Sequence, residues 1–154
     1  MQLLRKINHP NILQTKEGFY DGKNNMVMIV EFCGYGSLWH QMIHRIGQEW
    51  EDFQPFSEEI IIQMIHDASL ALAHCHKKGI AHLDMKAENL LIHANGRFKL
   101  ADFGISKLVD VEGQKQSGLK GTPGYKSPEL SQNILTTQSD IWGLGCIVYS
   151  ACTI

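Results

Sequence analysis

Apolar residues recur at helical spacing in several stretches of the chain. The opening "MQLLRKI" places three apolar side chains on one side and predicts a helix that is broken at Pro10. The stretch "GYGSLWHQMIHRI" opens with glycines and predicts a short helix with Ser37 as its N-cap. The longest predicted helix follows Ser57, has two glutamates in its first turn, and runs to about Lys78 before Gly79. Its buried face is expected to consist of Ile61, Ile62, Ile65, Ala68, Leu72 and Cys75.

Two other stretches have the signals of β-hairpins. "GFYDGKNNMVMIVEF" predicts two strands around a turn at Asp21–Asn25. "LLIHANGRFKLADFG" predicts a second hairpin, because Asn-Gly is the strongest short hairpin signal. If Asn95 and Gly96 form a two-residue loop, opposed positions sum to 191, and Asn89 faces Asp102 across the open end.

The second half of the chain alternates between a polar stretch and an apolar end. The Gly-rich residues from Asp110 to Gly124 predict a mobile loop. The last fourteen residues, "IWGLGCIVYSACTI", are too short to span a bilayer and predict a buried core helix. The order of elements therefore indicates an α+β fold, with a few strands and a mostly helical body.

Composition narrows the class of protein and of partner. The 154 residues are 44% hydrophobic and 19% charged, which indicates one soluble domain with a core. A net charge of −2 offers no basic footprint, so neither nucleic acid nor a membrane is expected as a partner. The four cysteines form no CxxC pair and lie among apolar residues. They predict reduced, buried thiols of an intracellular protein, cytoplasmic or nuclear, and no signal peptide opens the chain.

The stretch "HLDMKAENLL", residues 82–91, packs acid, base and amide side chains together just before a predicted strand. In the predicted hairpin the Cβ atoms of Asn89 and Asp102 lie about 5 Å apart. Carboxylate and amide oxygens suit Mg²⁺, which usually shares its coordination with phosphate. Asp84 and Lys86 reach the same end, where Asp84 is suited to act as a base and Lys86 to stabilise negative charge. A polar turn with an Asx cap is the plainer alternative.

Five motifs in order resemble those of the eukaryotic protein kinases. "HLDMKAEN" matches H-R-D-L-x-x-x-N except that Leu83 replaces Arg, and "DFG" is intact at 102–104. "SPE" at 127–129 stands where the family has A-P-E, and "GTPGY" at 121–125 is similar to its substrate-docking segment. "SDIWGLGCIVY" resembles the central helix of the family, whose aspartate would be Asp140.

The resemblance implies a protein-kinase-like fold, with a mostly helical C-lobe and a remnant of the N-lobe sheet. Residues 1–154 would form a partial kinase domain, with 1–30 as the N-lobe remnant and 31–154 as the hinge and upper C-lobe. The implied cofactors are ATP and Mg²⁺, and the implied partner is a protein substrate. Lys86 and Thr122 favour serine or threonine over tyrosine as the residue that is phosphorylated.

The same resemblance implies roles for individual residues. Asp84 would accept the proton of the substrate hydroxyl, Lys86 would steady the transferring phosphoryl group, and Asn89 and Asp102 would hold Mg²⁺. Leu4, His82 and Phe103 would belong to the stack that marks the active state. The residues implied at the nucleotide are Val30 as gatekeeper, the backbone of Glu31 and Cys33 at the adenine edge, Leu91 beneath the adenine, and Glu88 or Ser37 near the ribose.

The chain also departs from the family pattern. No G-x-G-x-x-G precedes a strand, and no V-A-I-K lysine is present, so a domain truncated at both ends and inactive by itself is expected. Three functions stay open: a catalytic segment of a serine/threonine kinase, a pseudokinase-like binding module, and a small-molecule phosphotransferase. The intact acidic and amide residues argue against the second, and "GTPGYKSPE" argues against the third. Both calcium/calmodulin-type and NimA-related kinases resemble the chain.

Overall fold

The computed structural model describes residues 7–46 and 55–153. The predicted opening helix therefore lies almost wholly outside the described residues, as does most of the segment that joins the first two helices. The four helices in this part are α1 (Leu38–Ile46), α2 (Glu58–His76), α3 (Pro128–Ser131) and α4 (Gln138–Thr153). The strands are β1 (Thr15–Tyr20), β2 (Met26–Val30), β3 (Ile80–Ala81), β4 (Leu90–Ile92), β5 (Phe98–Leu100), β6 (Lys107–Leu108), β7 (Gln114–Lys115) and β8 (Ile134–Leu135).

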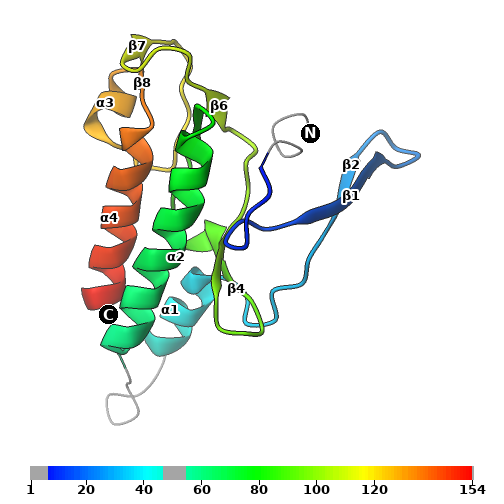
Figure 1. The fold of residues 1–154 in the computed structure, drawn as a ribbon, viewed down its shortest axis with the longest axis vertical. Helices are drawn as coiled ribbons and strands as arrows, with labels where there is room; N and C mark the ends of the chain where they lie inside the picture. Colours follow the sequence, from blue (N-terminus) through cyan, green and yellow to red (C-terminus); the bar gives the residue numbers. More distant parts are fainter. Residues whose placement is uncertain (1–6, 47–54, 154) are drawn as a thin grey trace.

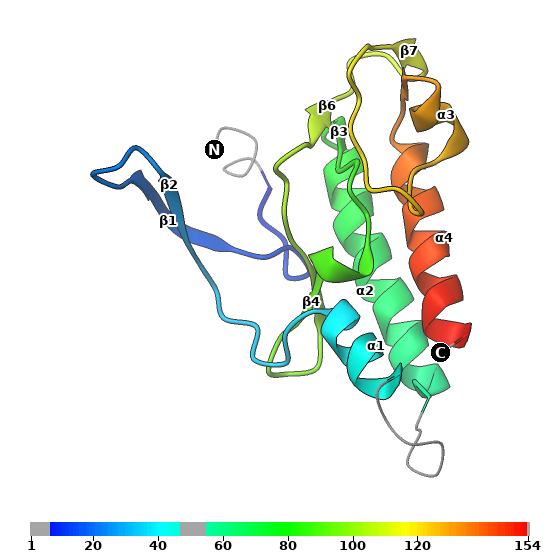
Figure 2. The same ribbon diagram turned by 180° about the vertical axis from the view of Figure 1, so that it is seen from behind.

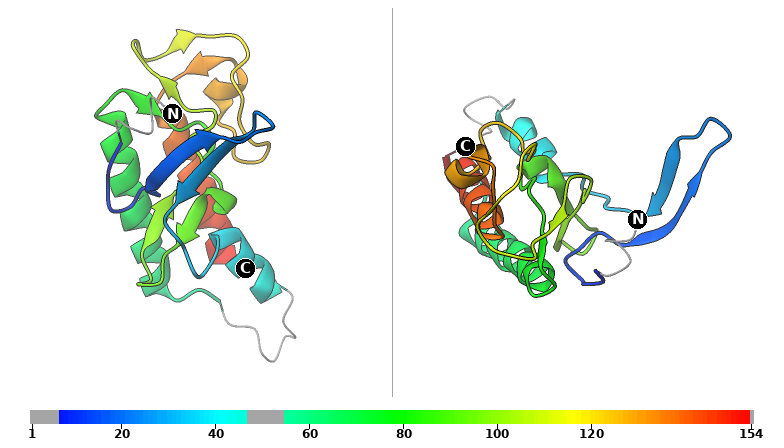
Figure 3. Two further views of the ribbon diagram at one scale, coloured as in Figure 1. Left: turned by 90° about the vertical axis from the view of Figure 1, so that its right-hand side faces the viewer. Right: turned by 90° about the horizontal axis from the view of Figure 1, so that it is seen from above.

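Strands β1 and β2 form the predicted antiparallel hairpin. The carboxylate of Asp21 organises the turn, because its Oδ1 accepts hydrogen bonds of 2.8 Å from the backbone N–H groups of Lys23 and Asn25. The hairpin projects away from the helices (Figures 1 and 3), and most of its side chains are exposed. It meets the body through the segment before β1, where Ile12 forms a parallel bridge with Leu100 of β5.

Helices α2 and α4 lie side by side and enclose most of the core (Figure 1). Helix α2 begins as predicted, with the Ser57 hydroxyl accepting the N–H of Ile60 at 3.4 Å. It ends in a turn that closes on Gly79, whose φ of +66° is a conformation that glycine adopts readily. The core between the two helices contains Ala68, Leu72 and Ile147, each fully buried.

The buried face of α2 differs from the prediction at two positions. Ile62 is 56% exposed and Ile65 is 36% exposed, whereas Met64 and Asp67 are buried. The run of isoleucines allows two overlapping apolar stripes, and contacts with the β4–β5 hairpin and α4 select the stripe that contains Met64. Asp67 belongs to that stripe because Arg97 and the N–H of Phe98 bind its carboxylate.

The predicted burial of the cysteines and of the last helix is only partly confirmed. All four cysteines are free, but only Cys75 is buried, and Cys152 is exposed. Helix α4 buries one face and exposes Ile141, Trp142 and Tyr149 on the other. None of the helices described is both long and apolar enough to cross a membrane.

The β4–β5 hairpin exists, but its predicted register is wrong. Leu90 pairs with Leu100 and Ile92 with Phe98, so opposed positions sum to 190. The loop is longer than two residues: the N–H of His93 bonds to the carbonyl of Arg97, and Gly96 has a φ of +79°. This is the three-residue loop that ends in a left-handed glycine, and it shifts every opposed pair by one position.

The stretch predicted as a mobile loop contains ordered structure. β6 pairs with β3 (Figure 2), and β7 within this stretch pairs with β8 (Figure 1). The carboxylate of Glu112 also accepts hydrogen bonds from the hydroxyl of Thr137 at 2.7 Å and from its N–H at 3.1 Å. The segment between Gly104 and Gly121 is thus joined to the chain just before α4 at several points.

Candidate active site

Asp84 is the centre of a compact hydrogen-bonded cluster. Its Oδ1 accepts a 2.6 Å bond from the hydroxyl of Thr122, and its Oδ2 lies 3.0 Å from the ammonium of Lys86. Lys86 also donates to the Thr122 hydroxyl at 3.2 Å. The side-chain amide of Asn89 donates to Oδ2 of Asp84 at 3.1 Å and to its backbone carbonyl at 2.8 Å. Four of the predicted site residues therefore lie together.

The cluster holds Asp84 in its ionised form. Burial raises the pKa of Asp84, but the hydrogen bonds from Thr122, Lys86 and Asn89 and the charge of Lys86 outweigh burial and lower it below its ordinary value. For Lys86, burial lowers the pKa, while the partnership with Asp84 and the charges of Glu88 and Asp102 raise it. The two side chains thus form a charged pair at neutral pH. The effect of Asp102 on the pKa of Lys86 shows that the carboxylate of Asp102 lies near the ammonium of Lys86.

Asn89 and Asp102 occupy the same end of the hairpin, but not as a cross-strand pair. The carbonyl of Asn89 accepts the N–H of Ala101 at 2.8 Å, so Asp102 is the next residue along the chain. Asp102 has a φ of +59°, which is unusual for a residue other than glycine, and its side chain is exposed. Its Oδ1 accepts the N–H of Gly104 at 3.0 Å. A backbone turn at Asp102 thus replaces the predicted pairing.

Asp140, at the start of α4, fixes the backbone of the loop that carries Asp84. Its buried carboxylate accepts the N–H of His82 at 2.8 Å and that of Leu83 at 2.7 Å. Leu83 has a φ of +68°, a conformation that costs a branched side chain about 1–3 kcal/mol. The two bonds to a buried, charged acceptor offset that cost, so the strained turn persists directly before Asp84.

His82 connects this loop with the segment that contains Asp102. Its Nδ1 accepts the N–H of Asp84 at 3.3 Å, and its Nε2 donates to the carbonyl of Ala101 at 2.9 Å. The ring of Phe103 packs edge-on against the imidazole, with the ring centres 4.7 Å apart. Two members of the expected stack are therefore in contact, while Leu4 lies outside the described residues.

Gly143 of α4 allows the helix to pack directly against the loop of residues 82–86. A Cβ atom at this position would lie 2.6 Å from the Cβ of Met85 and 3.0 Å from its carbonyl oxygen. Neither atom is the end of a flexible side chain. Only glycine therefore permits this approach, and Met85 lies between Asp84 and Lys86.

Leu83 is buried in a second apolar cluster, which includes Leu119 from the segment after "DFG" and Leu130 from α3. The remaining members are Ala81 and Leu135, with Ile105 and Val109 packed against them. The position that has an arginine in the family pattern is thus the centre of a hydrophobic contact. That contact holds the segment containing Leu119 against the loop of residues 82–86.

The predicted hinge lies between β2 and α1. The N–H of Glu31 donates to the carbonyl of Gln14 at 2.9 Å, and the carbonyl of Cys33 accepts the N–H of Gly36 at 3.1 Å. The carbonyl of Glu31 and the N–H of Cys33 have no partner within the described residues. Val30 is 38% exposed at the start of this segment. The hinge therefore presents one acceptor and one donor.

Two of the other predicted nucleotide residues, Ser37 and Leu91, lie next to the hinge. Leu91 forms a bridge with Ser37, so the two are neighbours. The Ser37 hydroxyl is buried and caps α1, where it lies 2.7 Å from Nδ1 of His40. Glu88 is exposed. The ribose roles of Ser37 and Glu88 and the adenine role of Leu91 stay predictions.

The donor set around Asp84 fits a cation that is shared with phosphate. Among the described residues, no group of three or more His, Cys, Asp or Glu side chains is placed to hold a metal by itself. Asn89 turns its NH₂ toward Asp84, which leaves its Oδ1 as an acceptor, and Asp102 is an exposed carboxylate. Two such oxygens plus phosphate are typical of Mg²⁺ sites.

A separate pocket of about 410 Å³ lies between α1, the start of α2 and the β4–β5 hairpin. Its lining includes Arg45, Phe56 and Ile60, and none of the predicted site residues. The guanidinium of Arg45 lies 3.9 Å over the ring of Phe56. The pocket is thus distinct from the cluster around Asp84.

Comparison with known proteins identifies the class. The sequence model of the protein kinase domain family matches residues 1–154. The chain therefore belongs to the protein kinase family and has the α+β fold of that family. The chain is 36% identical to the serine/threonine-protein kinase RUNKEL of Arabidopsis thaliana over 156 residues, which cover 99% of this chain and 11% of RUNKEL.

Several of the relatives are serine/threonine-protein kinases named Nek. The chain is 35% identical to the human serine/threonine-protein kinase Nek5, covering 99% of this chain and 21% of Nek5. It is 33% identical to the mouse serine/threonine-protein kinase Nek4, covering 99% of this chain and 19% of Nek4. The chain thus spans about a tenth to a fifth of the length of these three relatives.

Three residues that pack against or support the candidate site were not predicted from the sequence. Lys99 is buried at the hinge, Leu119 packs with Leu83, and Gly143 approaches Met85. A signal existed only for Lys99, which is a charged residue between two apolar ones in a short strand. Nothing local distinguishes Leu119 or Gly143, because their roles depend on contacts far along the chain.

Proposed function

We propose that this chain is the catalytic segment of a serine/threonine protein kinase, which transfers the terminal phosphoryl group of ATP to a hydroxyl of a protein substrate. The observation that supports it best is the cluster in which Thr122, Lys86 and Asn89 all bind the carboxylate of Asp84. The ionised carboxylate of Asp84 already accepts a hydrogen bond from the hydroxyl of Thr122. It is therefore suited to accept another from the hydroxyl of the substrate and to orient that hydroxyl.

Each residue of the cluster has a separate task in this proposal. Asp84 orients the substrate hydroxyl and accepts its proton as the bond to phosphorus forms. Lys86 donates hydrogen bonds to the phosphoryl oxygens as negative charge is redistributed. Asn89 and Asp102 would hold Mg²⁺, which when bound neutralises charge on the phosphates. Thr122 positions the docking segment against Asp84, so that the substrate residue arrives within reach.

Adenine recognition is assigned to the hinge. The carbonyl of Glu31 is an acceptor for the adenine amino group, and the N–H of Cys33 is a donor for the neighbouring ring nitrogen. Val30 and Leu91 would contact the faces of the base. In this proposal residues 1–30 belong to the N-lobe, and residues 31–154 form the hinge and the upper C-lobe.

The test uses the complete protein with radiolabelled ATP, Mg²⁺ and a generic serine- and threonine-containing protein substrate. Label transfer that is lost in Asp84→Asn supports the proposal. Binding of ATP without transfer in the wild type would instead support the pseudokinase-like module. Transfer to small alcohols or amines but not to protein would support the small-molecule phosphotransferase.

A further inference from the structure

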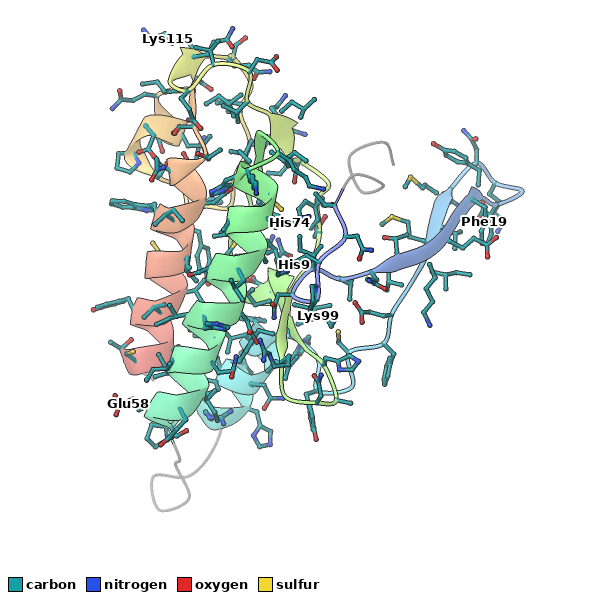
Figure 4. The ribbon with its side chains drawn as sticks, in the orientation of Figure 1. His9, Phe19, Glu58, His74, Lys99 and Lys115 are labelled. Carbon is teal, nitrogen blue, oxygen red and sulfur yellow. The ribbon has the colours of Figure 1, made fainter. Side chains whose placement is uncertain are left out.

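Lys99, the middle residue of β5, has its ammonium group in the interior beside the hinge. The residue is 8% exposed, and its Nζ donates to Oε1 of Glu31 at 2.9 Å and to the carbonyl of Pro10 at 2.8 Å. Figure 4 shows Lys99 in the body of the molecule, beside the segment that leads into β1 and far from Phe19. A buried ammonium needs such partners, because leaving it unpaired is costly.

Two hydrogen bonds join Glu31 to Gln14. Its Oε1 accepts the N–H of Gln14 at 2.7 Å, and its own N–H donates to the carbonyl of Gln14 at 2.9 Å. Burial raises the pKa of Glu31, but the bonds from Gln14 and Lys99 outweigh burial and lower it. The carboxylate is therefore turned inward as an anion. Because Lys99 and Gln14 occupy this carboxylate, the hinge offers the backbone of Glu31, and not its side chain, to the nucleotide.

Three parts of the chain meet at this ion pair. Pro10 and Gln14 belong to the segment before β1, Glu31 is the first residue after β2, and Lys99 lies three residues before Asp102. The side chain of Glu31 is 18% exposed and that of Lys99 is 10% exposed, so solvent and salt screen their attraction little. The pair is thus a direct link between the hinge and the strand that leads to the predicted metal ligand.

We propose that Lys99 is a positioning residue for adenine recognition: through Glu31 it fixes the hinge backbone so that the Glu31 carbonyl and the Cys33 N–H face the base at a constant spacing. Lys99 itself contacts no part of the nucleotide. This inference rests on the proposed function, since it assigns the adenine to the hinge. Without the pair, the partly buried Glu31 anion loses a donor and the hinge backbone relaxes.

The experiment measures adenosine affinity and ATP kinetics of the complete protein, with Lys99→Met and Glu31→Gln as the disrupting variants. Adenosine has no phosphates, so its affinity reports on the hinge and not on Asp102 or Lys86. We expect about a tenfold weaker adenosine Kd and a similar rise in the KM for ATP, with kcat nearly unchanged, for loss of one charge-assisted hydrogen bond. Lys99→Arg retains donors for Glu31 and Pro10 and should bind adenosine as the wild type does.

Arg97→Gln is the matched control. It disrupts the ion pair with Asp67 in the same hairpin and lowers stability, but the guanidinium of Arg97 bonds to Asp67 and to neither Lys99 nor Glu31. Unchanged adenosine affinity in Arg97→Gln, with weakened affinity in Lys99→Met, supports the inference. Equal adenosine affinity in Lys99→Met, Glu31→Gln and the wild type overturns it while the proposed function stands. Absence of adenosine and ATP binding in the wild type overturns the proposed function, and this inference with it.

If Lys99→Met does not fold, Glu31→Gln and Lys99→Arg still decide the question. Hydrogen exchange of the amide of residue 31, which bonds to the carbonyl of Gln14, provides a measurement that needs no nucleotide. Faster exchange of this amide in Glu31→Gln than in Arg97→Gln supports the positioning role, and equal exchange contradicts it.

Discussion

The hydroxyl of Thr122 donates a 2.6 Å hydrogen bond to Oδ1 of Asp84, although the two residues lie 38 positions apart. Thr122 belongs to the segment proposed to dock the substrate, and Asp84 is the proposed base. The bond therefore aligns the docking segment with the carboxylate before any substrate arrives, and it stabilises the ionised form of that carboxylate.

Replacing Thr122 should change the pH dependence of transfer. Its hydrogen bond is one of the contacts that lower the pKa of Asp84, so Thr122→Val should raise that pKa. As the pH falls, a carboxylate with a higher pKa becomes protonated at a higher pH and can then no longer act as a base. The acid limb of the kcat/KM profile should therefore move toward higher pH in Thr122→Val, and stay in place in Thr122→Ser. Coincident limbs in the two variants would contradict this role.

Asp84→Asn and Asp102→Ala should both abolish transfer, but through different steps. Asp84→Asn removes the proposed base, and we expect kcat to fall by a factor of about 10²–10⁴ with Mg²⁺-dependent ATP binding retained. Asp102→Ala removes a proposed metal ligand, and Mg²⁺-dependent binding should weaken. Calorimetric titration with ATP, in the presence and absence of Mg²⁺, compares the two. Wild-type binding by Asp102→Ala would exclude its metal role.

Transfer should depend only weakly on phosphorylation of the segment between Gly104 and Gly121. Leu83 has no donor for a phosphate, and it packs with Leu119 instead. The β7–β8 pairing and the bonds from Thr137 to Glu112 hold the same segment without phosphate. Phosphatase treatment should therefore leave turnover near its untreated level. Replacing Ser117, a serine of this segment that could carry a phosphate, by alanine should do the same. A collapse of turnover after dephosphorylation would refute this independence.

The buried carboxylate of Asp67 should contribute stability that is lost in acid. Burial raises its pKa, but the bonds from Arg97, the N–H of Phe98 and His66 prevail and hold it below its ordinary value of 3.8. The pKa of Asp67 is therefore lower in the folded state than in the unfolded state. The stabilisation is fully present when the pH is above the pKa of the unfolded state, and it is lost as the pH falls through the pKa of the folded state.

Asp67→Asn should lower the free energy of unfolding at neutral pH by about 1–3 kcal/mol, since Arg97 loses its carboxylate partner. Its stability should also decline less steeply in acid than that of the wild type. Urea unfolding at a series of pH values measures both effects. Parallel curves for the two proteins would mean that Asp67 does not titrate in this range.

The 154-residue chain by itself should transfer phosphate slowly or not at all. It contains no Gly-rich loop to cover the phosphates and no lysine of the V-A-I-K type, and positioning supplies most of the rate in phosphoryl transfer. A filter-binding assay with the purified chain and a generic protein substrate measures this. Turnover comparable to that of ordinary protein kinases would contradict the prediction.

Much of the fold could be predicted because local signals and tertiary contacts agree. Ser57 and Gly79 mark the ends of α2 by capping chemistry, and the Asp21–Asn25 turn closes the first hairpin. The second hairpin shows where such reasoning stops. Asn-Gly predicts a turn at the right place, but a third loop residue changes the register by one. Asn-Gly is compatible with the two-residue loop and with the three-residue loop that ends in a left-handed glycine, so the loop sequence alone does not choose between them.

The site was predictable where a motif is contiguous and not where contacts join distant segments. Asp84, Lys86 and Asn89 lie within six residues, so their cooperation is visible in the sequence. The bond between Thr122 and Asp84 has no local signal, and neither has the ion pair of Lys99 with Glu31. Such pairs depend on how α4, the hairpin and the docking segment are brought together by the core.

The close approach of Gly143 to Met85 affects how inherited or engineered variants of this protein should be classified. Residue 143 lies in α4 and outside the predicted site residues, so a substitution there would ordinarily be classified as mild. The first added methyl group would instead push against the backbone between Asp84 and Lys86. If the proposed function holds, alleles at this codon are expected to behave like alleles of Asp84 and Lys86, even when the encoded protein is abundant and folded.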